Sequence, residues 1–314
     1  MHIVVTGALG HIGSHLIRAL PERFPDLDLT LIDNMSTQRY ASLFNLPSAA
    51  RYRFIEGDVM RLALEPLFDG ADLVIHLAAI TDAAGSFDMR EKVERENFGA
   101  TERVAAACVA TGTAMMLSSS TSVYGTQKSL VDENCGAEDL KPQSPYAETK
   151  LREEALVAGL AAQGKLRAII FRFGTIFGTS PGMRFHTAVN KFCWQAVLGQ
   201  KLTVWRTAYD QVRPYLALED AGRAIAFALE RNLFDGRIYN VVTSNHTVRQ
   251  VVETIGAKLG AVDVGFVDEK IMNQLSYEVA NTRMLAAGFT FIGNLDRGIA
   301  DTVALLRNMN GAAR

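Results

Sequence analysis

The chain has 314 residues, 48% of them hydrophobic and 21% charged, and its formal net charge is −2. This length suits one large domain or two modest ones with a substantial core. The nearly neutral charge gives no electrostatic reason to expect nucleic acid or an anionic membrane as a partner. The three cysteines are scattered and form no Cys-x-x-Cys pair, which predicts a reducing compartment. We see no signal peptide and no apolar run of membrane-spanning length, so we expect a cytoplasmic location. Six scattered histidines predict no metal site.

The start of the chain predicts a dinucleotide site. A short β-branched run at residues 2–6 leads into Gly7-Ala8-Leu9-Gly10-His11-Ile12-Gly13, and residues 14–20 read as the following helix. Glycines allow a tight turn and a close backbone approach, and free helical amides face a pyrophosphate. We therefore expect this turn to bind a dinucleotide through Gly7, Gly10, His11, Ile12 and Gly13. The alternative is a turn that only packs the helix against the strand.

Acidic residues follow the next two predicted strands. Residues 28–32 end at Asp33-Asn34, and an acid in this place accepts hydrogen bonds from the adenosine ribose and repels a 2′-phosphate. Asp33 thus favours NAD over NADP, although Arg39 leaves a case for NADP. Residues 51–55 end at Gly57-Asp58-Val59, where Asp58 either contacts the adenine or caps a helix.

Two further strands are predicted on either side of a charged helix. Residues 73–79 end in the small residues Ala78 and Ala79, and His76 within this run is more typical of a core histidine than of a ligand. Residues 88–108 read as one long helix with a solvated face, whose apolar side could meet another subunit. Residues 114–117 form the fifth strand, and the hydroxyl residues that follow, 118–122, are expected at the ligand crevice.

Tyr146-Ala147-Glu148-Thr149-Lys150 follows Pro145 and opens a predicted helix over residues 146–160. At a spacing of four, Tyr146 and Lys150 lie on one helical face. An ammonium near a phenol favours the phenolate, so the tyrosine can act as a base near neutral pH. A serine after the fifth strand could share its proton. Without the upstream motifs, this pair would read as an ordinary surface helix.

The second half of the chain is less regular. We predict a sixth strand at residues 167–173, a glycine-rich stretch at 174–182, a helix at 185–198, strands at 202–205 and 212–216, and helices starting at Asp220, Thr247 and Leu295. Thr247 and Gln250 have the spacing of a capping box. The whole pattern predicts an α/β fold with a doubly wound parallel (Rossmann) sheet over residues 1–173. A smaller, interleaved α/β substrate domain is expected over 174–314, with segments near 213–231 returning to the Rossmann core.

Several motifs together carry a family resemblance: Gly7-x-x-Gly10-x-x-Gly13, Asp33-Asn34, Gly57-Asp58-Val59, His76-Leu77-Ala78-Ala79, Asn97, Ser119-Ser120-x-x-Val123-Tyr124-Gly125 and Tyr146-x-x-x-Lys150. The chain resembles the extended short-chain dehydrogenases/reductases of the NAD-dependent epimerase/dehydratase group, which act on nucleotide sugars. This resemblance implies that Tyr146 is the catalytic base, that Lys150 lowers its pKa and holds the nicotinamide ribose, and that Ser120 assists.

The same resemblance implies further contacts and a partner. NAD is expected to touch the glycine-rich turn, Tyr146, Lys150 and these residues: Asp33, Asn34, Asp58, Val59, Leu77, Ala78, Ala79, Asn97, Ser118 and Phe173. The nucleotide-sugar substrate is expected at Thr81, Ser120, Thr175, Arg184 and Arg213. Helices at 88–108 and 146–160 would form a homodimer interface.

The chain departs from the family pattern in ways that bear on the reaction. Family dehydratases carry Thr-Asp-Glu where this chain has Ser120-Thr121-Ser122, which disfavours dehydration. Thr175 replaces an asparagine of the substrate diphosphate site, and the second arginine expected near residues 273–277 is missing, so Arg184 or Arg283 would substitute. We expect a C4 epimerase. The alternatives are a net sugar 4-dehydrogenase or ketoreductase, a uronate decarboxylase, or a non-catalytic dinucleotide sensor.

Overall fold

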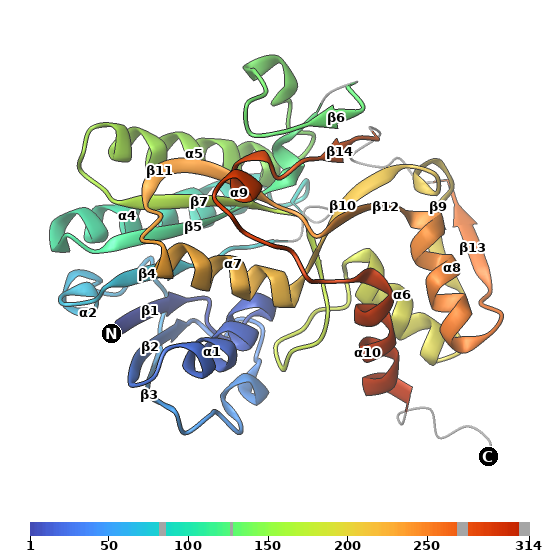
Figure 1. Ribbon diagram of the computed structural model, residues 1–314, viewed down its shortest axis with the longest axis horizontal. Coiled ribbons are helices and arrows are strands. Elements are labelled where there is room, and N and C mark those ends of the chain that lie inside the picture. Colours follow the sequence, from blue (N-terminus) through green and yellow to red (C-terminus); the bar gives the residue numbers. More distant parts are fainter. Residues whose placement is uncertain (82–85, 126–127, 269–275, 308–314) are drawn as a thin grey trace.

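The computed structural model describes residues 1–81, 86–125, 128–268 and 276–307. Its main layer is a seven-stranded sheet in the order β11-β7-β5-β4-β1-β2-β3, in which all neighbouring strands are parallel (Figure 1). The strands are β1 His2–Thr6, β2 Leu27–Asp33, β3 Ala50–Glu56, β4 Leu73–His76, β5 Ala114–Ser120, β7 Ala168–Phe173 and β11 Asp235–Val241. The prediction of a doubly wound parallel sheet is confirmed.

Helices cover both faces of this sheet because its central strands are apolar on both sides. Every residue of β4 and β7 is buried, which is typical of parallel strands. On one face lie α1 (His11–Arg23) and α7 (Leu218–Glu230), which share a core with Ile3 and Leu29. On the other lie α2 (Glu65–Phe68), α4 (Gly99–Thr111) and α5 (Pro145–Ala162). The second half of the chain therefore supplies α7 and β11 to the main core.

A smaller group of elements has its own core. It contains the sheet β12-β10-β8 (β8 Thr175–Phe177, β10 Val212–Ala217, β12 Ser244–Thr247), the pair β13-β9 (β9 Leu202–Trp205, β13 Val264–Val267), and the helices α6 Ala188–Val197, α8 Val248–Leu259 and α10 Leu295–Arg307. The predicted capping box is confirmed, because the Thr247 side chain accepts from the Gln250 amide and the Gln250 side chain accepts from the Thr247 amide. Outside this group lie the short pair β14-β6 (β6 Leu130–Val131, β14 Glu278–Val279), which has a separate small core, and α9 (Thr282–Ala286), whose Met284 packs in the main core.

The prediction of one long charged helix at residues 88–108 is wrong in one respect. This segment consists of α3 (Arg90–Val93), a π-helix at Glu94–Phe98 and α4, and not of one continuous α-helix. A π-helix changes the direction in which successive side chains point, and such segments are frequent at functional sites. The fourth strand also ends at His76, so Leu77–Ala79 form the turn that leaves the sheet.

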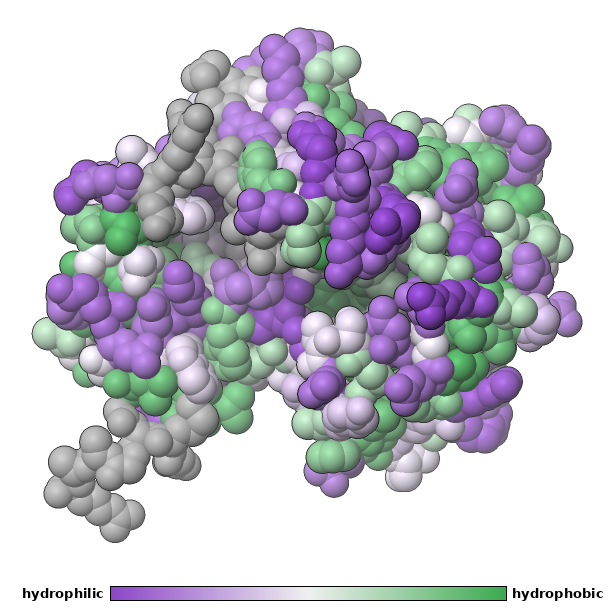
Figure 2. Space-filling view, turned by 180° about the vertical axis from the view of Figure 1, so that it is seen from behind, coloured by the Kyte–Doolittle hydropathy of each residue, from purple (hydrophilic) through white to green (hydrophobic). Residues whose placement is uncertain are grey.

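The two halves form lobes that are divided by a notch along the lower edge of the molecule, and hydrophilic residues are spread over both (Figure 2). In Figure 1, α6, α8 and α10 stand to one side of the main sheet. Within the described ranges of the chain, none of the helices combines the length and the apolar character needed to cross a bilayer.

Candidate active site

A cleft of about 280 Å³ opens at the carboxyl ends of β1, β2 and β4, where the strand order of the main sheet reverses. Ligands of open α/β sheets bind at such a switch point. Most of the residues predicted to bind a cofactor line it: Gly7, Gly10, His11, Ile12, Gly13, Asp33, Asn34, Asp58, Val59, Leu77, Ala78, Ala79, Asn97, Ser118, Tyr146 and Lys150. Thr81 and Arg184, which were predicted to bind substrate, line it too.

The glycine-rich turn joins β1 to α1 in a shape that side chains would block. Gly7 has a φ of +67°, and a Cβ there would lie 2.7 Å from the Ala78 nitrogen. A Cβ on Gly13 would lie 2.5 Å from the Ala8 carbonyl oxygen. Helix α1 begins at His11, and no side chain caps its first amides. These amides point at the cleft end of the helix, as a pyrophosphate site requires.

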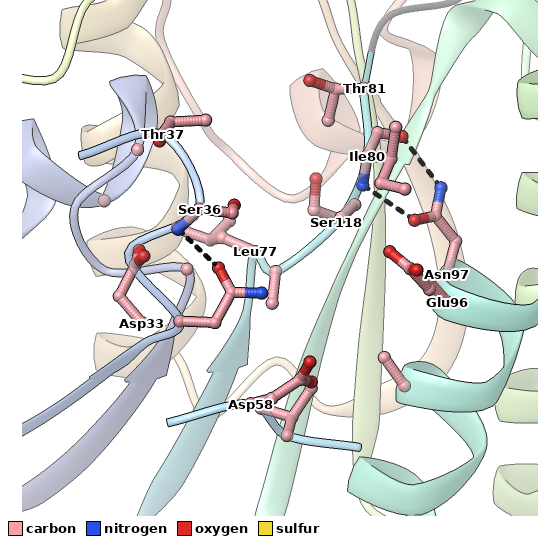
Figure 3. A pocket seen from close by; sticks show the side chains of 18 of the residues that line it. Asp33, Ser36, Thr37, Asp58, Leu77, Ile80, Thr81, Glu96, Asn97 and Ser118 are labelled. Atoms are coloured by element: carbon pink, nitrogen blue, oxygen red, sulfur yellow. Dashed lines mark hydrogen bonds between the residues drawn. The ribbon is translucent and has the colours of Figure 1, made fainter. Parts of the chain in front are cut away.

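Asp33 is fixed at the end of β2 by backbone amides. Its carboxylate accepts hydrogen bonds from Leu9 at 3.1 Å and from Met35 at 2.9 Å. Each oxygen keeps a lone pair for a ribose hydroxyl. Burial lowers the pKa of the half-buried Arg39, while the Asp33 carboxylate opposes this change. Ser36 and Thr37 also line this side of the cleft and were not predicted (Figure 3).

Asn97 lies in the opposite wall, on the π-helix. Its side chain accepts from the Ile80 amide at 2.8 Å and donates to the Ile80 carbonyl at 2.9 Å (Figure 3). Asn97 therefore holds the segment that follows β4 against the cleft. Lys92 and Glu96 line the cleft as well, although their charge pattern had suggested only a solvated face. A pattern of alternating charges does not reveal a π-helix, which changes the direction in which side chains point.

Two histidines near the cleft are neutral at physiological pH. His11 is 8% exposed and donates to the Gly178 carbonyl at 2.8 Å, and burial lowers its pKa to about 4. His76 is buried, as predicted, and burial lowers its pKa to about 3. Its Nδ1 bonds the Thr6 hydroxyl at 2.7 Å, whereas its Nε2 has no hydrogen-bond partner among the described residues. Asp58 caps its own turn by accepting from the Met60 amide at 2.9 Å and also lines the cleft.

Helix α5 brings the tyrosine and lysine together. Ser144 caps it by accepting from the Ala147 amide at 3.2 Å, and Pro145 occupies its first turn. The Lys150 ammonium lies 5.8 Å from the centre of the Tyr146 ring. Burial raises the pKa of Tyr146, while Lys150, Arg184 and a hydrogen bond with Ser120 act to lower it.

Ser120 ends β5 and begins a 3₁₀ turn, η3 (Thr121–Val123). Its hydroxyl accepts from the Ser122 amide at 3.1 Å and from the Ser122 hydroxyl at 2.9 Å. The side chain of Thr121 donates to the Phe173 carbonyl at 3.2 Å. Residues 120–122 thus present hydroxyl groups, and no acid, beside Tyr146.

A loop from the second half of the chain reaches into the cleft. Arg184 donates to the Thr81 hydroxyl, and Asn190 holds the Arg184 carbonyl at 3.0 Å. The same loop is attached to helix α1, since the Gly182 amide donates to the Ser14 hydroxyl at 2.9 Å. The loop therefore links the glycine-rich turn to the side of the cleft beyond Tyr146.

Several predicted residues lie elsewhere. Phe173 is buried in β7 with its ring 5.7 Å from that of Phe171, and Thr175 and Arg213 do not line the cleft. Ser120 is not a lining residue either, but it hydrogen-bonds Tyr146, which is. Arg213 lies on β10 and donates to the Val212 carbonyl at 3.2 Å. Arg283 donates to the backbone carbonyls of Ile238 and Glu133, so its guanidinium makes structural contacts and does not line the cleft. Of the segment where a second arginine was sought, residues 273–275 lie outside the described part of the chain.

Sequence reasoning missed one buried acid beside the lysine. Glu153 pairs with Lys150 at 2.8 Å, and their side chains are 0% and 4% exposed. A spacing of three on the same helix as Lys150 was the available signal. The arrangement as a whole fits a dinucleotide: an uncapped helix start, a carboxylate at the ribose position, and a phenol with a lysine farther along the cleft.

Comparisons with known proteins agree with this geometry. A trifunctional UDP-glucose 4,6-dehydratase/UDP-4-keto-6-deoxy-D-glucose 3,5-epimerase/UDP-4-keto-L-rhamnose-reductase of Arabidopsis thaliana is 28% identical over 317 residues, covering 96% of this chain and 46% of the relative. The chain thus spans about half the length of the plant relatives that it matches.

Two solved structures are similar over their full length. The UDP-N-acetylglucosamine 4-epimerase from Methanobrevibacter ruminantium M1, in complex with UDP-N-acetylmuramic acid, is 25% identical with a TM-score of 0.85, covering 98% of each chain. MoeE5 in complex with UDP-glucuronic acid and NAD is 26% identical with a TM-score of 0.85, covering 98% of this chain and all of that one. The model of the NAD-dependent epimerase/dehydratase family matches residues 3–241. The chain therefore belongs to this family of NAD-dependent enzymes.

Proposed function

We propose that the protein is a nucleotide-sugar epimerase that inverts the sugar at C4. The observation that carries this proposal is the chemistry around Tyr146. Its phenol is flanked by the Lys150 ammonium and the Ser120 hydroxyl, and the adjoining residues 120–122 have only hydroxyl side chains. This set can remove and return a proton but offers no acid for expelling water.

In this mechanism Tyr146 takes the proton from the C4 hydroxyl and gives it back to the same oxygen. The Ser120 hydroxyl hydrogen-bonds Tyr146 and stabilises the developing phenolate. Lys150 favours the same charge through its ammonium. NAD, when bound, supplies a reversible hydride acceptor at C4. Between the two transfers the ketone rotates in the site, so hydride returns to the opposite face of C4. Because the sugar loses a hydride and then regains it, the reaction has no net redox change.

The substrate is proposed to be a nucleotide sugar, as in the two solved complexes with UDP-sugars. Arg184 lines the cleft and, like Lys150, lowers the pKa of Tyr146, and we assign its guanidinium to an anionic part of that substrate. The region 174–314, which carries Arg184, Thr175 and Arg213, is proposed to be mainly substrate-binding. Arg213 and Thr175 lie on β10 and β8, beyond the residues that line the cleft.

The test is to incubate the NAD-loaded protein with UDP-, dTDP-, GDP- and CDP-sugars, both neutral and uronic. Ultraviolet absorbance reports NADH, and proton NMR identifies the product. The proposal predicts a C4 epimer without lasting NADH, and loss of about 10²–10⁴-fold in rate for Tyr146→Phe. NADH that accumulates with the sugar would identify a dehydrogenase, and loss of carbon dioxide would identify a decarboxylase; both would contradict the epimerase.

We also propose a homodimer through the helical segments at residues 88–108 and 146–160, which overlap with α4 and α5. Helices α4 and α5 lie side by side on one face of the main sheet (Figure 1). Light scattering at micromolar protein should give twice the chain mass of 34.3 kDa, and a monomeric mass would overturn this assignment.

A further inference from the structure

Two adjacent acids of helix α5 have different surroundings. Glu154 is buried, and both of its oxygens are satisfied: Oε1 accepts from Ser119 and from Arg172, and Oε2 accepts from Arg172 at 2.6 Å. This pair joins α5 to β7 as an ordinary structural contact. Glu153 is more deeply buried but has only Lys150 as a partner, and its Oε1 has no hydrogen-bond partner among the described residues.

Burying a carboxylate with one oxygen unpaired is costly, so its position needs a reason. Tyr146, Lys150 and Glu153 follow one another at spacings of four and three, which places them along one face of α5. Lys150 lies between the other two, and its ammonium contacts the carboxylate at 2.8 Å. The tyrosine thus faces an ion pair and not an isolated cation.

We infer that Glu153 is a positioning residue, which holds the Lys150 ammonium and compensates its charge, and thereby limits how strongly Lys150 activates Tyr146. This inference rests on the proposed function of Tyr146 as the base. Glu153 acts through Lys150 and touches neither the cleft nor Tyr146 in the contacts described. Its carboxylate raises the pKa of Tyr146, opposing Lys150.

Arg184, Glu154 and His76 also interact electrostatically with Tyr146 or Lys150. Arg184, from the loop after β8, lowers the pKa of Tyr146. Glu154 raises the pKa of Lys150 together with Glu153 and Tyr146, against the effect of burial. Burial lowers the pKa of His76, from β4, to about 3, so this histidine stays neutral throughout the range in which a tyrosine titrates. Glu153 is therefore the acid to replace in order to test how its charge affects Lys150 and Tyr146.

The test is an ultraviolet titration of the Tyr146 phenol in the NAD-loaded protein. The chain has eight tyrosines, so the signal is taken as the difference between each protein and the same protein carrying Tyr146→Phe. Glu153→Gln keeps an oxygen that accepts from the ammonium but removes the negative charge. We expect the midpoint to move down by about one pH unit, which raises the phenolate fraction at a fixed lower pH about tenfold.

Two controls separate this effect from general damage. Glu148→Gln removes the same charge from a partly exposed position of the same helix, where Glu148 pairs with Arg90, and should leave the midpoint unchanged. Glu153→Asp keeps the charge and should restore most of the original midpoint. If Glu153→Gln does not fold, as judged by thermal unfolding, Glu153→Met removes the charge with a similar volume and should give the same downward shift.

An unchanged midpoint, or one that moves to higher pH, would overturn the inference; the latter would mean that Glu153 mainly keeps Lys150 protonated. The titration needs no sugar, so it decides this point even if the epimerase proposal fails. Conversely, the protein could epimerise a sugar while Glu153→Gln leaves the Tyr146 midpoint unchanged. That result would overturn only the inference and leave the proposed function standing. Where a sugar is turned over, the acid limb of the pH profile of kcat should move with the titration midpoint.

Discussion

At the scale of single residues, the proposed proton transfer depends on the groups around Tyr146. Burial alone would make Tyr146 a poor base, because it raises the pKa of the phenol. Cations and hydroxyls reduce that effect: Lys150 from the same helix, Ser120 from the end of β5 and Arg184 from the second half of the chain. The pKa of the proposed base thus depends on groups from three separate parts of the sequence.

Replacing Arg184 by Gln tests the contribution from the second half of the chain. Loss of a charge-assisted hydrogen bond to the substrate, worth about 1.5–3 kcal/mol, should raise KM about ten- to a hundredfold. Because Arg184 lowers the pKa of Tyr146, its loss should also move the acid limb of the kcat profile to higher pH. Steady-state kinetics across pH measure both effects.

Arg237→Gln is the matched control for this prediction. The side chain of Arg237 is 70% exposed on β11, where it pairs with Asp235 of the same strand. Its removal should change neither KM nor the pH profile. An Arg184→Gln enzyme with an unchanged KM would show that the substrate does not contact this guanidinium.

At the scale of elements, the loop at residues 178–184 connects the two halves of the cleft. Its Gly182 packs so closely that a Cβ would lie 2.6 Å from the Gly10 carbonyl oxygen, within the glycine-rich turn. Ser180 adds a hydrogen bond from its hydroxyl to the His11 carbonyl at 2.9 Å. The position of Arg184 is therefore tied to the shape of the turn that is expected to bind the pyrophosphate.

Gly182→Ala should disturb both sites through this contact. The added methyl group forces the loop away from the turn, so we expect a loss of about 1–3 kcal/mol in the free energy of unfolding and weaker NAD binding. Gly159→Ala is the control, since a Cβ at Gly159 in α5 meets no atom within 4 Å and should stabilise the helix by up to about 1 kcal/mol. Urea unfolding and calorimetric NAD titration measure the two effects, and equal behaviour of both variants would contradict the coupling.

The elements also explain which parts of the site were predictable from the sequence. The glycine-rich turn, Asp33 and the pair Tyr146–Lys150 depend on local spacing within one strand–turn–helix or one helix, and all of them lie in the cleft. The contact of Asn97 with Ile80 depends on a π-helix, which alternating charges do not reveal.

Positions in the second half depend on contacts between distant strands. Arg213 pairs in register with His246 on β12, and Phe173 packs on Phe171 inside the main sheet. The pairing of Arg213 with His246 cannot be read from local periodicity, because it depends on which strands become neighbours, whereas Phe173 and Phe171 lie on the same strand. The sequence therefore predicted the parallel sheet and its cleft better than the positions of the residues proposed to bind the substrate.

At the scale of the whole molecule, buried neutral histidines make stability depend on pH. Burial lowers the pKa of His11 to about 4 and of His76 to about 3, from an ordinary value of 6.5. The unfolded chain thus binds protons below pH 6.5 that the folded chain does not bind until pH 4 or lower. The stability contributed by these groups is complete above pH 6.5 and is lost as the pH falls toward 4.

We therefore expect the free energy of unfolding of the NAD-free protein to fall steeply between pH 6.5 and 4. Each unit of difference in pKa is worth about 1.4 kcal/mol, so His11 alone should contribute on the order of 3 kcal/mol. Urea unfolding at a series of pH values measures the slope. His11→Gln can still donate to the Gly178 carbonyl but cannot take up a proton, so it should make the slope less steep. An unchanged slope would show that His11 does not cause the pH dependence.

The central claim is that hydride leaves C4 of the sugar and returns to the same carbon. The most direct test is to supply a UDP-sugar labelled with deuterium at C4 and to locate the label in the product by NMR. The account predicts the C4 epimer with deuterium still at C4 and no label in free cofactor. Deuterium at C6 of a product that has lost water, or deuterium released in NADH, would contradict it.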